Sequence, residues 1–160
     1  MHVNGIPIHP LLVHAVVVFV PLAALSAILY ALVPRWRWLL RWPTLVLPLA
    51  GVVLMRAAVI TGISLKNEKK FTGVLGDRIA THERWGHRLE WSVWVFAVVA
   101  VLAVWVLPHV TPLTGREDRV SPRPSWAKVA VVLLPVAAAV VLVLAVITGD
   151  AGARAVWKTV

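Results

Sequence analysis

The chain has 160 residues, of which 60% are hydrophobic and only 14% charged, and its formal net charge is +9. Soluble domains contain about one quarter charged residues, so this composition, with a mean hydropathy of +0.85, excludes an ordinary soluble domain. There is no cysteine, which excludes disulfides, thiolate metal sites and thiol nucleophiles. The positive charge lies between apolar runs, where it is typical of contact with lipid headgroups rather than with nucleic acid.

Four apolar runs are long enough to cross the hydrocarbon core of a bilayer, which takes about 20 helical residues. They occupy residues 11–33, 44–63, 77–107 and 126–148. The first run is longer than the apolar part of a cleavable signal peptide and follows ten residues without Lys or Arg, so we expect it to stay in the mature protein. The connection after it is short, which makes the first two runs an antiparallel hairpin. The sequence predicts an all-α fold, a polytopic membrane four-helix bundle of two tandem helix hairpins.

The two hairpins resemble copies of each other, with repeat halves at residues 1–66 and 77–153. A shift of 73 residues places His9 on His82 and His14 on His87. A shift of 87 residues aligns 48–62 with 135–149, where eight of fifteen positions are identical, including a Pro and the ending Ala-Val-Ile-Thr-Gly. Each half holds two helices, so both halves enter the membrane from one side, as in parallel repeats related by an axis along the membrane normal. The histidines and the Thr-Gly ends are therefore expected to meet at one end of the bundle.

Within each half the two histidines, His9 and His14 or His82 and His87, are five residues apart. This spacing leaves them roughly 140° apart around the helix. One helix therefore aims one histidine inward, and two helices supply two inward histidines. That arrangement is typical of the axial ligands of haem b in a helix bundle, with a function in electron transfer. His14 and His87 are our first choice because they lie deeper than His9 and His82.

Other residues at this end support a haem hypothesis. The Thr-Gly ends would let backbone approach a flat macrocycle, because Gly has no side chain in the way. These candidate residues are Thr61, Gly62, Thr148 and Gly149. Arg56 lies six residues, or about 9 Å, inside the boundary marked by Gly62. It is a candidate partner for a haem propionate, although an arginine at this depth also snorkels towards the headgroups.

Alternative functions stay open at this point. A metal ion held by His14, His87 and Asp150, or by Glu83, is one, and a non-catalytic membrane subunit or scaffold that docks a membrane or redox protein partner is another. The segment from His82 to His87 is not the His-Glu-x-x-His zinc-protease motif, because it has one residue too many. Interfacial histidines and helix-capping glycines are the structural alternatives. Serine, cysteine and phosphate-loop arrangements are absent from the sequence, and whether the protein is an enzyme stays open.

The segment His9-Pro10-Leu11-Leu12-Val13-His14 resembles the bacterial family called domain of unknown function 2231, described as predicted membrane proteins. The family pattern is His-Pro-x-x-Val-His near the start of helix one, Thr-Gly ending helices two and four, and a His near the start of helix three. Positions 61–62, 82 or 87, and 148–152 match it, so the resemblance covers nearly the whole chain. Ala15 replaces a common aromatic residue, and Asp150 replaces a frequent His, which weakens a ligand role for the tail. The resemblance implies four helices and no settled activity.

The charge distribution gives a weak indication of orientation. Lys and Arg number eight on the histidine side and seven on the other, so the count does not decide. The uncharged N-terminus, followed by three Arg after the first run, favours both termini outside. We therefore expect a multi-pass protein of the inner (plasma) membrane with its termini outside and the lipid bilayer as its surroundings.

Overall fold

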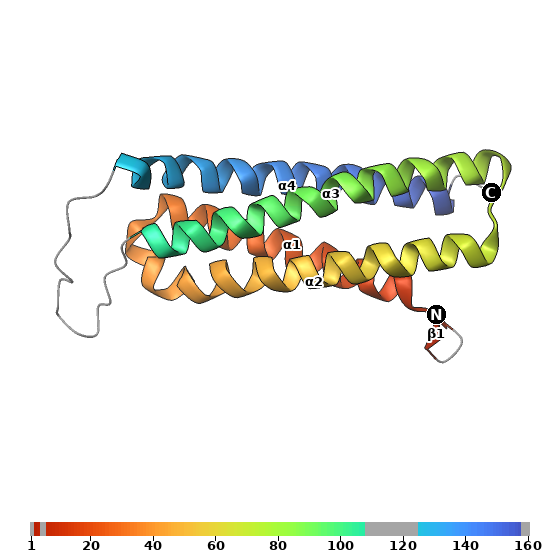
Figure 1. The fold of residues 1–160 in the computed structure, drawn as a ribbon, viewed down its shortest axis with the longest axis horizontal. Helices are drawn as coiled ribbons and strands as arrows, with labels where there is room; N and C mark the ends of the chain where they lie inside the picture. Colours follow the sequence, from red (N-terminus) through yellow and green to blue (C-terminus); the bar gives the residue numbers. More distant parts are fainter. Residues whose placement is uncertain (1, 4–5, 108–124, 158–160) are drawn as a thin grey trace.

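The structure, a computed structural model, describes residues 2–3, 6–107 and 125–157. Its elements are β1 (His2–Val3), β2 (Ile6–Pro7), α1 (Ile8–Leu32), the 3-10 helix η1 (Pro34–Trp36), α2 (Arg37–Lys69), α3 (Gly73–Val106) and α4 (Ser125–Trp157). The two short strands pair antiparallel. The four α-helices are all long and apolar enough to cross a membrane and form one bundle (Figure 1), which confirms the predicted fold class.

The helices surround the bundle axis in chain order. α1 packs against α2 and α4, and α3 packs against the same two helices. α1 and α3 are therefore diagonal neighbours, as are α2 and α4. Both ends of the chain lie at the same end of the bundle (Figure 1). At this end α1 and α3 begin, and α2 and α4 finish.

Small residues let the helices approach closely at the bundle axis. The fully buried alanines on α1 and α3 include Ala24, Ala27 and Ala100, and small side chains at such contacts are typical of helix packing in membranes. Large apolar side chains such as Val53, Trp105 and Val146 point outwards and are exposed. Because a bilayer is as apolar as these side chains, their exposure is consistent with lipid contact. In hydrocarbon the backbone must satisfy its own hydrogen bonds, which is why these runs are helices.

α2 begins earlier than the apolar run that we expected from residue 44, because the basic and aromatic residues before that run are also helical. The side chain of Arg37 is buried and donates from Nε to the carbonyl of Tyr30 and from Nη2 to that of Ala31, each at 3.0 Å. These carbonyls belong to the last turn of α1 and have no later N–H partner within the helix. Arg37 thus caps α1 and joins the first hairpin at this turn.

The connection between α2 and α3 is three residues long, whereas the apolar runs expected over 44–63 and 77–107 left residues 64–76 between them. Lys70 ends α2 in a left-handed conformation, with φ 46°, and its N–H bonds to the carbonyl of Lys66. Gly73, which starts α3, also has a positive φ, of 64°. Hydropathy marks only the part of a helix that lies in lipid, and these helices continue past it with polar residues. The segment between the third and fourth expected runs, residues 108–125, lies almost wholly outside the described residues.

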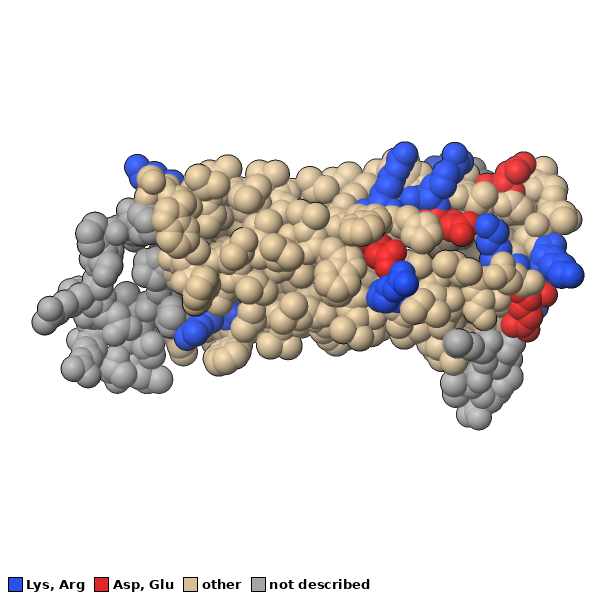
Figure 2. All heavy atoms as spheres, in the orientation of Figure 1, with Lys and Arg blue, Asp and Glu red and all other residues tan. Residues whose placement is uncertain are grey.

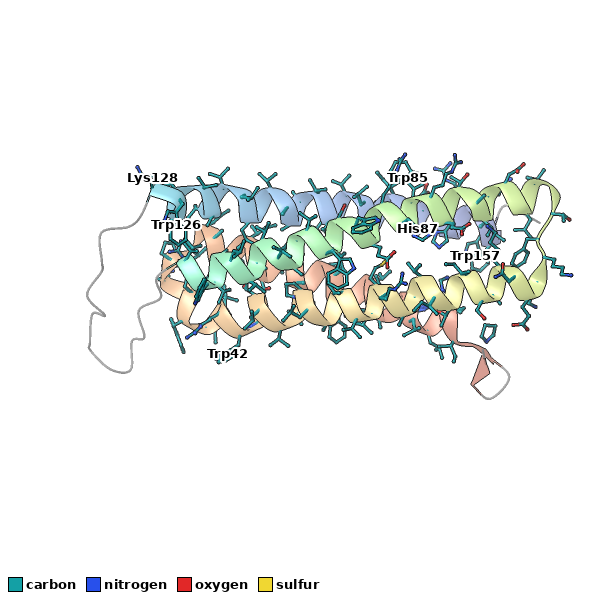
Figure 3. All side chains as sticks on the ribbon, viewed as in Figure 1. Trp42, Trp85, His87, Trp126, Lys128 and Trp157 are labelled. Atoms are coloured by element: carbon teal, nitrogen blue, oxygen red, sulfur yellow. The ribbon has the colours of Figure 1, made fainter. Side chains whose placement is uncertain are left out.

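Tryptophans and charges mark the two ends of the bundle. Trp36, Trp38, Trp42, Trp105 and Trp126 are exposed, and Figure 3 places Trp42 and Trp126 at the end opposite the termini. On the face seen in Figure 2, the charged residues gather towards the end with the termini, and the middle is almost free of them. Such tryptophans are typical of the interface, so a hydrocarbon span of about 20 residues places the other boundary near Trp85 on α3 and Val146 on α4.

Candidate functional site

Two histidines face each other across the bundle axis at the end with the termini. His9 lies in the first turn of α1, and His82 lies on the diagonal helix α3. Their ring centroids are 6.4 Å apart, and the ring planes are inclined by 74°. His82 is three residues, or about 4.5 Å, outside the boundary estimated at Trp85. The site therefore lies where the hydrocarbon meets the headgroups.

A backbone carbonyl of a neighbouring helix holds each of these rings. His9 donates from Nδ1 to the carbonyl of Ala58 on α2, at 2.9 Å, and His82 donates from Nδ1 to the carbonyl of Thr148 on α4, at 3.0 Å. A carbonyl only accepts, so Nδ1 carries a proton in both rings, and in a neutral ring Nε2 then has the lone pair. Within the described part of the chain, neither Nε2 has a hydrogen-bond partner. Each ring is thus held by one backbone carbonyl, and its Nε2 has no partner among the described residues.

Each ring packs against a glycine that leaves room for it. A Cβ added at Gly62 would lie 2.9 Å from Cε1 of His9, and one added at Gly152 would lie 3.0 Å from Cε1 of His82. Both distances are shorter than ordinary contact. By contrast, a Cβ added at Gly149 would have no neighbour within 4 Å. The sequence pointed to Gly62 and Gly149; in the structure the glycine beside His9 is Gly62, and the glycine beside His82 is Gly152.

The contacts in the two halves therefore repeat with a shift of 90 residues, from Ala58 to Thr148 and from Gly62 to Gly152. The sequence repeat has a shift of 87. The difference of three residues is about one helical turn, so α4 meets α3 one turn further along than the sequence alignment implies. Residues that are identical in the two halves consequently have different neighbours. The second half still has a glycine beside its histidine, because Gly152 lies one turn after Gly149.

The two threonines of the Thr-Gly ends differ in the same way. Oγ1 of Thr61 donates to the carbonyls of Ala57 and Ala58, at 2.8 and 3.1 Å, and lies 3.5 Å from Nδ1 of His9. Oγ1 of Thr148 is buried and has no partner among the described residues. A buried hydroxyl without a partner is costly. This hydroxyl belongs to the same residue whose carbonyl accepts from His82, so the site contains a hydroxyl without a hydrogen-bond partner among the described residues.

The structure brings together His9 and His82 rather than His14 and His87, our first choice. His14 is exposed and donates from Nδ1 to the carbonyl of Pro10 on its own helix, at 2.6 Å. Nδ1 of His87 lies 3.4 Å from Oε2 of Glu90, also on its own helix. The angle of roughly 140° within each pair explains the outcome, because the outer histidine of each helix points inward and the deeper one then turns away.

The remaining candidate residues form ion pairs away from the two facing rings. Arg56 donates to Glu90, at 3.2 Å, and this ion pair joins α2 to α3, with the side chain of Glu90 almost fully buried. Asp150 pairs with Arg154 at 2.7 Å on the exposed surface of α4, and Glu83 pairs with Lys66. Among the described residues, no group of three or more His, Asp or Glu is placed to hold a metal ion.

Comparison with known proteins identifies the family. No curated protein and no solved structure matches the chain. The family model of domain of unknown function 2231, described as a predicted membrane protein, matches residues 5–160. This match covers nearly the whole chain and confirms the resemblance seen in the His-Pro-x-x-Val-His segment. The chain belongs to the domain of unknown function 2231 family of predicted membrane proteins.

Proposed function

We propose that the protein binds one haem b, with His9 and His82 as its two axial ligands, and that it serves in electron transfer. The carrying observation is the pair of imidazoles from diagonal helices, with ring centroids 6.4 Å apart. A bond from a metal ion to an imidazole nitrogen is about 2 Å long, so two imidazoles on opposite sides of one ion have centroids roughly 6 Å apart. The observed separation matches that spacing.

The number of ligands favours haem over a bare metal ion. A transition-metal site built from side chains needs three or four donors, and the described residues supply two at this place. A porphyrin brings its own four nitrogens, so two axial histidines complete its coordination. This argument replaces the alternative in which His14, His87 and Asp150 hold a metal ion.

The surrounding residues orient both ligands before any cofactor binds. The carbonyls of Ala58 and Thr148 accept the Nδ1 protons and hold the rings in place. Such hydrogen bonds fix the tautomer and raise the basicity of the other nitrogen. Haem bound here would supply reversible one-electron chemistry at the membrane boundary. Arg56 has no part in this proposal, because Glu90 already occupies its guanidinium group.

Visible spectra of the purified protein, reconstituted with haem in detergent, test this proposal. We expect sharp Soret and α bands on reduction, typical of a six-coordinate low-spin haem. H9A and H82A should lose this spectrum, because each leaves at most one axial ligand. H14A and H87A are matched controls, because each removes a histidine one or two turns deeper on the same helix. These two variants should retain the low-spin haem spectrum. Failure of the wild-type protein to bind haem, or loss of the spectrum in H14A and H87A alone, would contradict the proposal.

A further inference from the structure

One face of α3 carries two exposed arginines, Arg84 and Arg88, at the estimated membrane boundary. They are four residues apart, so they are neighbours on the helix surface. Nη2 of Arg84 donates to Oγ1 of Thr81, at 3.1 Å, and the guanidinium group of Arg88 lies over the ring of Trp85, 4.5 Å from its centroid. Each arginine therefore contacts the side chain three residues before it. We call these four residues the arginine strip.

Both guanidinium groups point out of the hydrocarbon and into the headgroup layer. Side chains of an α-helix lean towards its N-terminus, and α3 begins outside the membrane at this end. The Cα atom of Arg88 is about 4.5 Å inside the boundary at Trp85, but its contact with that ring places the guanidinium group at the boundary itself. The contact with Thr81 places the guanidinium group of Arg84 at the level of a residue about 6 Å outside. Because the headgroup region adds about 5–7 Å to the core on each side, the two cations lie at its inner and outer edges.

The carboxylates of the described residues leave these two cations unmatched. Neither Arg84 nor Arg88 forms an ion pair with any residue that the structure describes. The carboxylates closest to them in depth pair with other cations, and these pairs are Glu83–Lys66, Glu90–Arg56 and Asp150–Arg154. Asp77 lies seven residues, or about 10.5 Å, further out along α3 than Arg84, which is about one Debye length in 0.1 M salt. The headgroup layer beside α3 therefore has a local excess of positive charge.

We propose that the arginine strip binds an anionic phospholipid with an uncharged polyol headgroup, of the phosphatidylglycerol class. The phosphate of a phospholipid lies closer to the hydrocarbon than the rest of the headgroup, so Arg88 would pair with it through charge-assisted hydrogen bonds. The rest of the headgroup extends outwards to Arg84. Glycerol hydroxyls would accept hydrogen bonds from Arg84 there, whereas the ammonium group of phosphatidylethanolamine would place a like charge beside it.

Native mass spectrometry of the full-length protein in detergent tests the proposal, with phosphatidylglycerol and phosphatidylethanolamine titrated in separate experiments. An exposed charge interaction changes affinity by up to about fivefold, so phosphatidylglycerol should bind about two- to fivefold more tightly than phosphatidylethanolamine. R84Q should make the two affinities equal, because it removes the charge that distinguishes the headgroups. R84K preserves that charge and should retain the preference. R88Q should weaken the binding of both lipids.

R78Q is the matched control, because it removes the same charge from the same helix about 10 Å outside the boundary, beyond the headgroup layer. It should leave the lipid preference unchanged. Unchanged helix content by circular dichroism shows that the variants fold. Equal affinity of the two lipids for the unmodified protein, a preference that survives R84Q, undiminished binding of both lipids in R88Q, or an equal loss of preference in R78Q would each overturn the proposal. The arginine strip contains neither His9 nor His82, so these results do not depend on haem.

Discussion

A methyl group added at Gly62 tests the packing of His9 most sharply, because the chain offers a matched control at Gly149. In G62A the new Cβ would lie 2.9 Å from Cε1 of His9, about 0.5 Å closer than the 3.4 Å of ordinary contact. The ring must shift, and this strains its 2.9 Å hydrogen bond to the carbonyl of Ala58. In G149A the new methyl group meets nothing within 4 Å.

The expected magnitude follows from the difference between the two variants. Replacing a helical glycine by alanine stabilises a helix by about 0.5–1 kcal/mol, and this gain is common to both. Overpacking costs about 1–3 kcal/mol and applies to G62A alone. We therefore expect the free energy of unfolding of G62A to lie about 1–3 kcal/mol below that of G149A.

This difference can be measured by unfolding the haem-free protein in mixed micelles. The fraction of denaturing detergent is increased, and the loss of helix is followed by circular dichroism. G152A is the equivalent change beside His82, with a Cβ contact of 3.0 Å, and should resemble G62A. If G62A and G149A were equally stable, the ring of His9 would not pack against Gly62, and the geometry of the site would be wrong.

Two further predictions concern the polar contacts that join helices. R37Q should destabilise the protein by about 1–3 kcal/mol in the same unfolding assay, because it leaves carbonyls of α1 without their buried donors. The control R35Q, at an exposed position, should change the free energy of unfolding by less than about 0.5 kcal/mol. In a double-mutant cycle, R56Q and E90Q should show a coupling energy of about 1 kcal/mol, since their ion pair joins α2 to α3 and is half-exposed on the arginine side. Additive effects of the two changes would refute that coupling, and equal effects of R37Q and R35Q would refute the capping role.

The sequence was sufficient for the fold class and the family because both depend on strong patterns. Four runs of about 20 apolar residues have few alternatives to membrane helices. The His-Pro-x-x-Val-His segment and the Thr-Gly ends carried the family resemblance. The repeat also predicted that equivalent histidines would come from the two hairpins to one end, and His9 and His82 do so.

The details of the site depended on how the helices align, which the sequence did not fix. A shift of 87 residues is the best alignment of the sequence, whereas the contacts follow a shift of 90. Gly152 was missed for this reason, and its only sequence signal was a small residue one turn after Gly149. The choice between His9 and His14 needed the rotation of α1, which depends on contacts with two other helices. Hydropathy along one helix does not give that rotation.

Electron paramagnetic resonance of the ferric, haem-loaded protein tests the central claim most directly, because it reports both the axial ligands and the angle between their planes. His9 and His82 have ring planes inclined by 74°. Two axial imidazoles that are nearly perpendicular give a highly anisotropic low-spin signal, and this is the result that we predict, with its loss in H9A and in H82A. A high-spin signal in the wild-type protein, or a low-spin signal that survives both substitutions, would contradict ligation of haem by His9 and His82.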